Sequence, residues 1–134
     1  MSKENIELIK RTYEAFGDRD YEGVMSNFAN DFVWHAADSS PLGDQSPYHG
    51  VEAVRNEVFA RIAAAFEKLV VVPDEIFTGD EGRVVVLGYY HGNFRGKEHE
   101  FRTQVAHIWT VRSGKAVKFQ QHLDTLSVAE EAKK

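Results

Sequence analysis

The sequence predicts an α+β fold in which three N-terminal helices precede a long, mainly antiparallel sheet. Apolar residues recur at three- and four-residue spacing in the first half of the chain, which is typical of helices. From Leu69 onward the period of the apolar residues changes to two, which is typical of strands. Because a long sheet twists strongly, we expect it to curl around one helix and enclose a space between them.

Two helices are expected before residue 31. The first covers about residues 3–16, where Ile, Tyr and Phe residues form one face, and it stops at Gly17. The second is short, with Asp18 or Asp20 as its N-cap, and is expected to end near Asn30.

A strand, a loop and a third helix follow. Residues 31–36 are aromatic and β-branched and predict a strand. Residues 37–50 contain two prolines and two glycines without periodicity, so we expect a long loop of the kind that is often functional. An apolar stripe of valines, Ile62 and Phe66 predicts a helix over about 51–67.

The second half of the chain predicts a meander of four strands. They are expected near residues 69–77, 83–95, 98–112 and 115–124. The segments between them, TGDEG, Gly96-Lys97 and Arg112-Ser113-Gly114, are typical hairpin turns. The C-terminal tail, VAEEAKK, is expected to be frayed.

Register arguments assign the polar residues of these strands to faces. A two-residue turn at Gly96-Lys97 pairs Tyr90 with Thr103 and Val86 with His107. The face that we expect to meet the helices is the more apolar and aromatic one. It carries Val84, Val86, Gly88, Tyr90, Phe101, Thr103, Val105, His107, Trp109 and Val111.

The last hairpin allows two registers. A three-residue loop with Gly114 in a bulge places Phe119 beside His107 and sends Lys118 to solvent. A two-residue Ser113-Gly114 turn would place Lys118 against Trp109 in the interior, which is costly for a charge, so we favour the first register. In that register Asp124 faces outward unless a further bulge near residues 120–121 turns the strand.

Length and composition exclude several classes of protein. With 134 residues, we expect a single domain over 1–134. The net charge of −5 argues against a nucleic-acid partner or an anionic membrane surface. The chain has no cysteine, no leader-like N-terminus and no apolar run long enough to span a membrane, so we expect a cytoplasmic protein.

Three stretches carry a family resemblance: TYEAFGDRDYEGV, NDFVWHAADSSPLGDQSPYHGVEAV and AHIWTVRSGKAVKFQQHLDT. Together they resemble the SnoaL-like polyketide cyclase group of the nuclear transport factor 2-like (NTF2-like) superfamily, which also contains ketosteroid isomerase. The resemblance covers nearly the whole chain. It implies a curved sheet that forms a cone around the third helix, a deep internal pocket, and homodimers formed through the outer sheet face.

The resemblance also implies roles for individual residues. The cyclases use an aspartate on the last strand as general acid and base, and Asp124 stands at that position. His107 stands where the isomerase has a protonated acid, and the isomerase base falls at or next to His35-Ala36, where this chain has no carboxylate. Steroid isomerisation by that mechanism is therefore not implied, and the Asp-Arg-Asp arrangement of the fold's epoxide hydrolases is also missing.

The candidate catalytic residues are His107 and Asp124. A neutral imidazole on the inner face can donate to an enolate or take a proton, whereas a structural histidine would simply be satisfied by Gln121 or a carbonyl group. Asp124 would be the second proton carrier, and its structural alternative is a strand-end residue that caps Thr125 or faces water.

Further residues are candidates for ligand binding. Tyr90 and Tyr48 have phenols that need partners when buried, and Tyr90 is a candidate oxyanion donor. Tyr13 and Trp109 are most simply core residues but are also candidate contacts. The remaining candidates are His35, Gln121 and His122, of which His122 would pair with Asp124 only if both turned inward.

No cofactor or metal is expected. The six histidines include no i, i+4 pair on a helix, and His107 with His122 does not complete a three-ligand site. The leading hypothesis is a cofactor-independent acid-base enzyme, of isomerase or cyclase type, that acts on a hydrophobic carbonyl-containing small molecule. The alternatives are a module that binds such a ligand without chemistry, or a dimeric interaction protein. The dimer surface would include Leu87, Ala106, Ile108 and Leu123.

Overall fold

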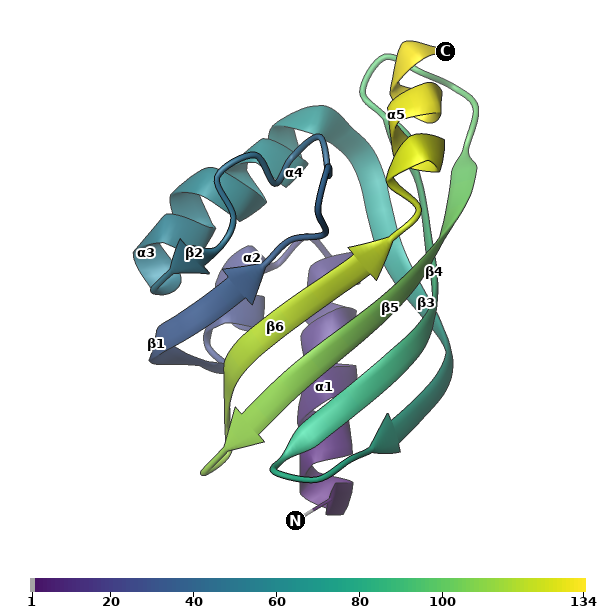
Figure 1. Ribbon diagram of the computed structural model, residues 1–134. Coiled ribbons are helices and arrows are strands. Elements are labelled where there is room, and N and C mark those ends of the chain that lie inside the picture. Colours follow the sequence, from purple (N-terminus) through teal and green to yellow (C-terminus); the bar gives the residue numbers. More distant parts are fainter. Residues whose placement is uncertain (1) are drawn as a thin grey trace.

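The computed structural model describes residues 2–134, which form a curved six-stranded sheet and several helices (Figure 1). The strands are β1 (Phe28–His35), β2 (Tyr48–His49), β3 (Phe66–Thr78), β4 (Arg83–Phe94), β5 (Phe101–Arg112) and β6 (Lys115–Leu123). The helices are α1 (Ser2–Gly17), α2 (Tyr21–Met25), α3 (Val51–Val54), the π-helical turn η1 (Arg55–Phe59), α4 (Ala60–Ala65) and α5 (Thr125–Lys133). None of the helices within the described residues is long and apolar enough to cross a membrane.

The sheet is mixed, with the strand order β2-β1-β6-β5-β4-β3. Only the β1–β6 pair is parallel, and the four other neighbouring pairs among the described strands are antiparallel. Figure 1 shows α1 behind the curved sheet, α3 and α4 beside the β2 end, and α5 at the end of β6 near the β4–β5 loop. The predicted α+β class is therefore confirmed.

Several predicted element boundaries are wrong. The second helix ends at Met25 rather than near Asn30, because the chain is already extended from Phe28 in β1. The third helical segment contains a π-helical turn and ends at Ala65. Phe66 begins β3 instead, where its ring packs on Phe94 with 4.6 Å between centroids. Aromatic packing against the neighbouring strand therefore overrides the helical pattern.

The C-terminal tail is helical rather than frayed. Asp124 is the N-cap of α5, and its carboxylate accepts a hydrogen bond from the Ser127 backbone N–H at 3.0 Å. Val128 is buried on the inner side of this helix. The capping and the apolar contact together stabilise a segment that periodicity alone did not identify.

The predicted β4–β5 register is confirmed. Tyr90 lies opposite Thr103, and Val86 lies opposite His107. The connection is longer than the expected two residues, since β4 ends at Phe94 and β5 begins at Phe101. Pairing stops there because the residues between them are polar or glycine and are mostly exposed.

The β5–β6 hairpin combines the two registers that the sequence allowed. Arg112 pairs with Lys115 around a two-residue turn, and the register then shifts between Thr110 and Val111. The bulge on β6 restores the parity that the turn would have reversed. As a result Lys118 is exposed, as predicted, but Phe119 lies opposite Trp109 and Gln121 lies opposite His107, two residues from the predicted pairing.

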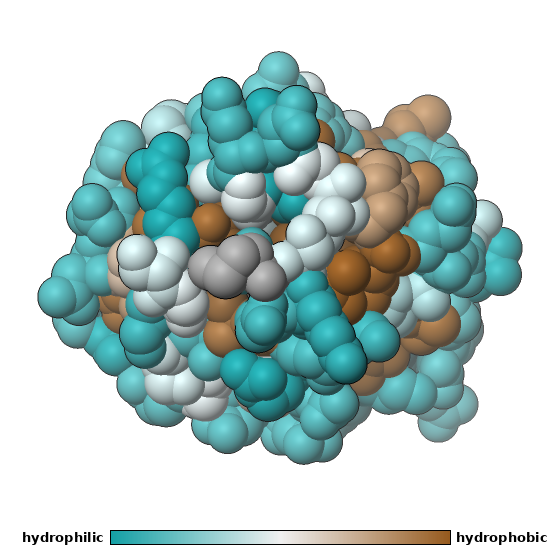
Figure 2. Space-filling model, turned by 90° about the horizontal axis from the view of Figure 1, so that it is seen from below, coloured by the Kyte–Doolittle hydropathy of each residue, from teal (hydrophilic) through white to brown (hydrophobic). Residues whose placement is uncertain are grey.

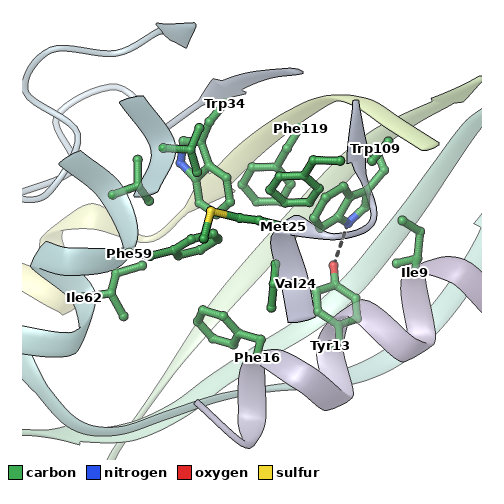
Figure 3. Close-up of a cluster of buried hydrophobic side chains, with 14 of the residues drawn as sticks. Ile9, Tyr13, Phe16, Val24, Met25, Trp34, Phe59, Ile62, Trp109 and Phe119 are labelled. Carbon is green, nitrogen blue, oxygen red and sulfur yellow. Dashed lines mark hydrogen bonds between the residues drawn. The ribbon is translucent and has the colours of Figure 1, made fainter. Parts of the chain in front are cut away.

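The core lies between α1, the α3–η1–α4 segment and the inner face of the sheet. Every predicted inward residue of β4 and β5 is buried. Figure 3 shows the rings of Phe59, Trp34, Phe119 and Trp109 between the helices and the strands. Seen from below, the surface is mainly hydrophilic, with hydrophobic residues gathered mostly on one side (Figure 2). The aromatic rings between the helices and the sheet leave little of the deep pocket that the resemblance implied.

Candidate functional site

Five side chains from four elements meet in the interior and form a buried polar network. They are Tyr13, Tyr90, His107, Trp109 and Gln121. Strand alternation turns the four sheet residues inward, and the helical spacing of α1 places Tyr13 on its buried face. Four of these residues are buried, whereas Gln121 is half-buried.

The network is a continuous chain of hydrogen-bonded atoms. The Trp109 indole N–H donates to the Tyr13 hydroxyl at 2.9 Å, a contact drawn in Figure 3. That hydroxyl lies 2.7 Å from Nδ1 of His107, and Nε2 of the same ring lies 3.0 Å from the Tyr90 hydroxyl. Gln121 Nε2 donates to the Tyr90 hydroxyl at 2.8 Å. His107 therefore has a partner on each ring nitrogen.

Burial keeps this network neutral. Desolvation, with a smaller contribution from the nearby charge of His122, lowers the pKa of His107 from 6.5 to about 3. Desolvation also raises the pKa of Tyr13 and of Tyr90 above the ordinary phenol value, against hydrogen bonds from Trp109 and Gln121 that lower them. At neutral pH the imidazole and both phenols are uncharged.

A small cavity, here called the outer chamber, opens beside Tyr90. Its volume is ≈ 60 Å³, counted as the space open to the centres of water-sized spheres. Its walls come from the 36–47 loop, η1, α4, the sheet and α5, and include Leu42, Ile62, Tyr90, Gln121, Leu123 and Val128. None of the described residues that line it is acidic or basic.

A second and smaller cavity, the inner chamber, has a volume of ≈ 20 Å³. Its walls include Tyr13, Phe16, Phe59, Tyr90, His107 and Trp109. The two chambers share Trp34, Ile62 and Tyr90 as walls. His107 lines only the inner chamber, so Tyr90 is the member of the Tyr13–His107–Tyr90 chain that faces the outer chamber.

Other predicted site residues lie outside the two chambers. His35 and His122 line a separate hollow with Asp38 and Gln120, which shares Ala36, Gln121 and Leu123 with the outer chamber. Tyr48 is buried, and its hydroxyl accepts the Gln45 backbone N–H at 3.3 Å. Tyr48 therefore anchors the loop and does not face either chamber.

Asp124 is not brought together with His107. Its side chain is exposed, caps α5 and lines a groove on the outer face of the sheet. The bulge in β6 precedes Phe119 instead of following it, so no later irregularity turns Asp124 inward. The structure thus places Asp124 as the outward-facing cap that the sequence allowed as its structural alternative.

Sequence reasoning missed several chamber residues. Val128 was missed because the tail was expected to be frayed, although the Asp-Thr-Leu-Ser cap signal at 124–127 was available. Leu42 lies in the loop that was expected to be functional, but nothing in the sequence indicated which loop residue turns inward. Thr103 has a buried hydroxyl without a partner among the described residues, on the same strand face as Phe101 of the outer chamber.

Within residues 2–134, no group of three or more histidine, aspartate or glutamate side chains is arranged to hold a metal ion. The Tyr90 hydroxyl and the Gln121 amide are the polar groups of the network that a molecule in the outer chamber would meet.

Solved structures define the class of protein. An NTF2-like protein of unknown function from Burkholderia pseudomallei is 30% identical, with a TM-score of 0.85 and 100% of both chains covered. TerC, which was co-crystallised with polyporic acid, is 28% identical, with a TM-score of 0.84 over 98% of this chain and 99% of TerC. A protein from Catenulispora acidiphila with a ketosteroid isomerase-like fold, solved with trimethylamine, matches with a TM-score of 0.80 over 95% and 92% of the chains at 17% identity, which shows the fold alone.

The family follows from the sequence match. The family model described as the SnoaL-like domain matches residues 9–119. The chain therefore belongs to the SnoaL-like family, within the NTF2-like fold, and the predicted resemblance is confirmed. A comparison with curated proteins gives no significant match.

Proposed function

We propose that the protein binds a small, mainly apolar molecule in the outer chamber and that Tyr90 donates a hydrogen bond to a carbonyl oxygen of this ligand. The observation that carries the proposal is that buried Tyr90 lines both chambers and that its hydroxyl is hydrogen-bonded to Gln121, which also lines the outer chamber. Buried apolar sites use a few fixed polar groups to orient a ligand, and Tyr90 with Gln121 supplies them here. The co-crystallisation of the related TerC with polyporic acid supports an organic ligand.

Acid-base catalysis on the same ligand class is a second candidate. A preorganised phenol donor stabilises the oxyanion that forms when a proton leaves the carbon next to a carbonyl group. His107 is a weak base at neutral pH, since its pKa is lowered to about 3, and Asp124 lies outside the chamber. A proton acceptor would therefore come from the adjoining hollow of His35 and His122.

Tyr90→Phe tests the proposal with two probes of matched shape. Acetophenone carries a carbonyl group, and α-methylstyrene replaces that oxygen by a methylene group. We expect the wild type to prefer acetophenone by about tenfold and Tyr90→Phe to lose the preference, since one hydrogen bond of about 1.4 kcal/mol is removed. Ligand-observed NMR titration measures both affinities, and Tyr21→Phe, which alters a tyrosine outside both chambers, is the matched control.

The same samples decide between binding and catalysis. In heavy water, exchange of the acetophenone methyl protons for deuterium reports enolisation. Exchange above the buffer rate that falls in Tyr90→Phe supports the enzyme, whereas ketone preference without exchange supports a binding module. Equal affinity of the wild type for the two probes would overturn the proposed function.

We also propose a homodimer formed through the outer face of β4 and β5. Leu87 pairs across the strands with Ala106, and Val85 pairs with Ile108, so apolar side chains adjoin on that face and are half-buried in the single chain. Leu123, also predicted for this surface, lines the outer chamber. Sedimentation equilibrium is expected to give about twice 15.2 kDa for the wild type.

The matched variants for the dimer are Ile108→Glu, which places a charge on the outer face, and Arg11→Glu, which places one on the exposed side of α1. Ile108→Glu is expected to sediment as a monomer, and Arg11→Glu is expected to sediment as the wild type does. A monomeric wild type, or a dimeric Ile108→Glu, would contradict this interface.

A further inference from the structure

The two ends of the buried polar network fix the direction of its outer hydrogen bonds. An indole N–H only donates, so the Tyr13 oxygen must accept from Trp109. The backbone N–H of Ala37 also only donates, and it lies 3.2 Å from Gln121 Oε1. The amide group of Gln121 is therefore turned with its NH₂ toward Tyr90, whose oxygen must accept.

His107 lies between the Tyr13 and Tyr90 hydroxyls, and its neutral ring carries one proton, on either Nδ1 or Nε2. A neutral imidazole donates from one nitrogen and accepts at the other, so only one of the two tyrosines can donate to it. Within the described residues the Tyr13 hydroxyl has Trp109 and His107 as hydrogen-bond partners. The oxygens of Tyr13 and Tyr90 each accept from one outer partner, so this count alone does not choose between them. Tyr13 does not line the outer chamber, so His107 Nδ1 is the acceptor available for its proton, whereas Tyr90 lines that chamber and can donate into it.

The two distances at the ring support the same assignment. Bonds donated by a hydroxyl group are usually shorter than bonds donated by an N–H group. The Tyr13 oxygen lies 2.7 Å from Nδ1, as expected for O–H donation, and the Tyr90 oxygen lies 3.0 Å from Nε2, as expected for N–H donation. The imidazole is thus oriented as a donor toward Tyr90.

We infer that His107 carries its proton on Nε2 and is a positioning residue that makes Tyr90 an obligate hydrogen-bond donor toward the outer chamber. Both lone pairs of the Tyr90 oxygen are then occupied, one by Gln121 and one by His107. Its O–H has no acceptor among the described network residues and is left for the ligand. The ligand atom that faces Tyr90 must be an acceptor such as a carbonyl oxygen.

This inference rests on the proposed function for the identity of the ligand but not for the tautomer. It changes the role expected for His107 from proton carrier to orienting group. It also gives Tyr13 an effect at a distance, because Tyr13 does not line the outer chamber. Without the Tyr13 hydroxyl, no donor keeps Nδ1 of His107 unprotonated. Nε2 can then accept a hydrogen bond from Tyr90, which competes with donation from Tyr90 to a ligand.

The test is the protonation of the His107 ring nitrogens, read by long-range ¹H–¹⁵N NMR of the full chain. We expect the wild type to show a neutral His107 with the proton on Nε2, and Tyr13→Phe to shift the proton toward Nδ1. We also expect Tyr13→Phe to lose most of the tenfold preference for acetophenone while its affinity for α-methylstyrene stays within about twofold. Tyr21→Phe should resemble the wild type in every readout.

The possible results separate the inference from the proposed function. A wild-type proton on Nδ1, or a Tyr13→Phe protein that keeps the Nε2 proton and the full ketone preference, would overturn the inference while ketone binding stands. An Nε2 proton in a wild type that does not prefer the ketone would overturn the proposed function and leave the tautomer assignment intact. If Tyr13→Phe does not fold, the wild-type spectrum alone still decides the tautomer.

Discussion

The free energy of unfolding of the wild type is expected to fall as the pH is lowered from about 7.5 to about 4.5, because His107 is buried in its neutral form. In the native protein its pKa is about 3, against the ordinary histidine value of 6.5 in the unfolded chain. Below pH 6.5 the unfolded chain therefore binds a proton that the native protein does not, and stability is lost as the pH falls. At about 1.4 kcal/mol per pH unit, the loss amounts to roughly 2–3 kcal/mol.

His107→Gln is expected to flatten this pH dependence, because it removes the titrating group and keeps a polar side chain in the network. Other charges facing the site act in both proteins, including His122, which also lowers the pKa of His107. Urea unfolding at several pH values measures the slope. His49→Gln, which changes an exposed histidine on β2, is the control and should keep the wild-type slope. An equal slope in His107→Gln and the wild type would show that His107 is not buried neutral.

The strand faces could be predicted because alternation is a local property. The pairing of Val86 with His107 follows from parity and one turn, and the longer loop after Phe94 does not change it. The pairing in the last hairpin could not be predicted in full, because no residue pattern in β6 indicates its single-residue bulge. Lys118 faces solvent, as the cost of burying its charge predicts, but a two-residue turn followed by a bulge produces this orientation instead of the predicted three-residue loop.

The candidate site could be predicted only in its sheet residues. Tyr90 and His107 were placed inward by alternation, and the structure brings them within 3.0 Å of each other. The role of Tyr13 could not be read from the sequence, because its contact with His107 spans 94 residues and depends on how α1 lies across the sheet. The family resemblance points to Asp124 as a proton carrier, whereas in the structure it is the N-cap of α5, a role that a local sequence signal indicates.

The curvature that brings β3 over the site depends on Gly88, which is buried on β4 two residues before Tyr90. A Cβ atom at this position would overlap the Val72 carbonyl oxygen and lie 2.9 Å from Pro73 Cα, both on the backbone of β3. The β3–β4 register shifts beside this point, between Pro73 and Glu75. Glycine therefore permits the close approach that bends β3 around the end of the sheet.

Gly88→Ala is expected to lower the free energy of unfolding by about 3 kcal/mol, because backbone atoms cannot move aside as a flexible side chain would. Gly79→Ala is the matched control, since its Cβ would meet only Arg83 Cβ at 3.8 Å, and we expect a change within about 0.5 kcal/mol. Urea unfolding measures both. If β3 can shift away from Gly88→Ala, the free energy of unfolding would change little. The strand paired with Tyr90 would then be displaced, and the preference for acetophenone would fall. Wild-type stability together with wild-type ketone preference would show that the bend at Gly88 supports neither the fold nor the site.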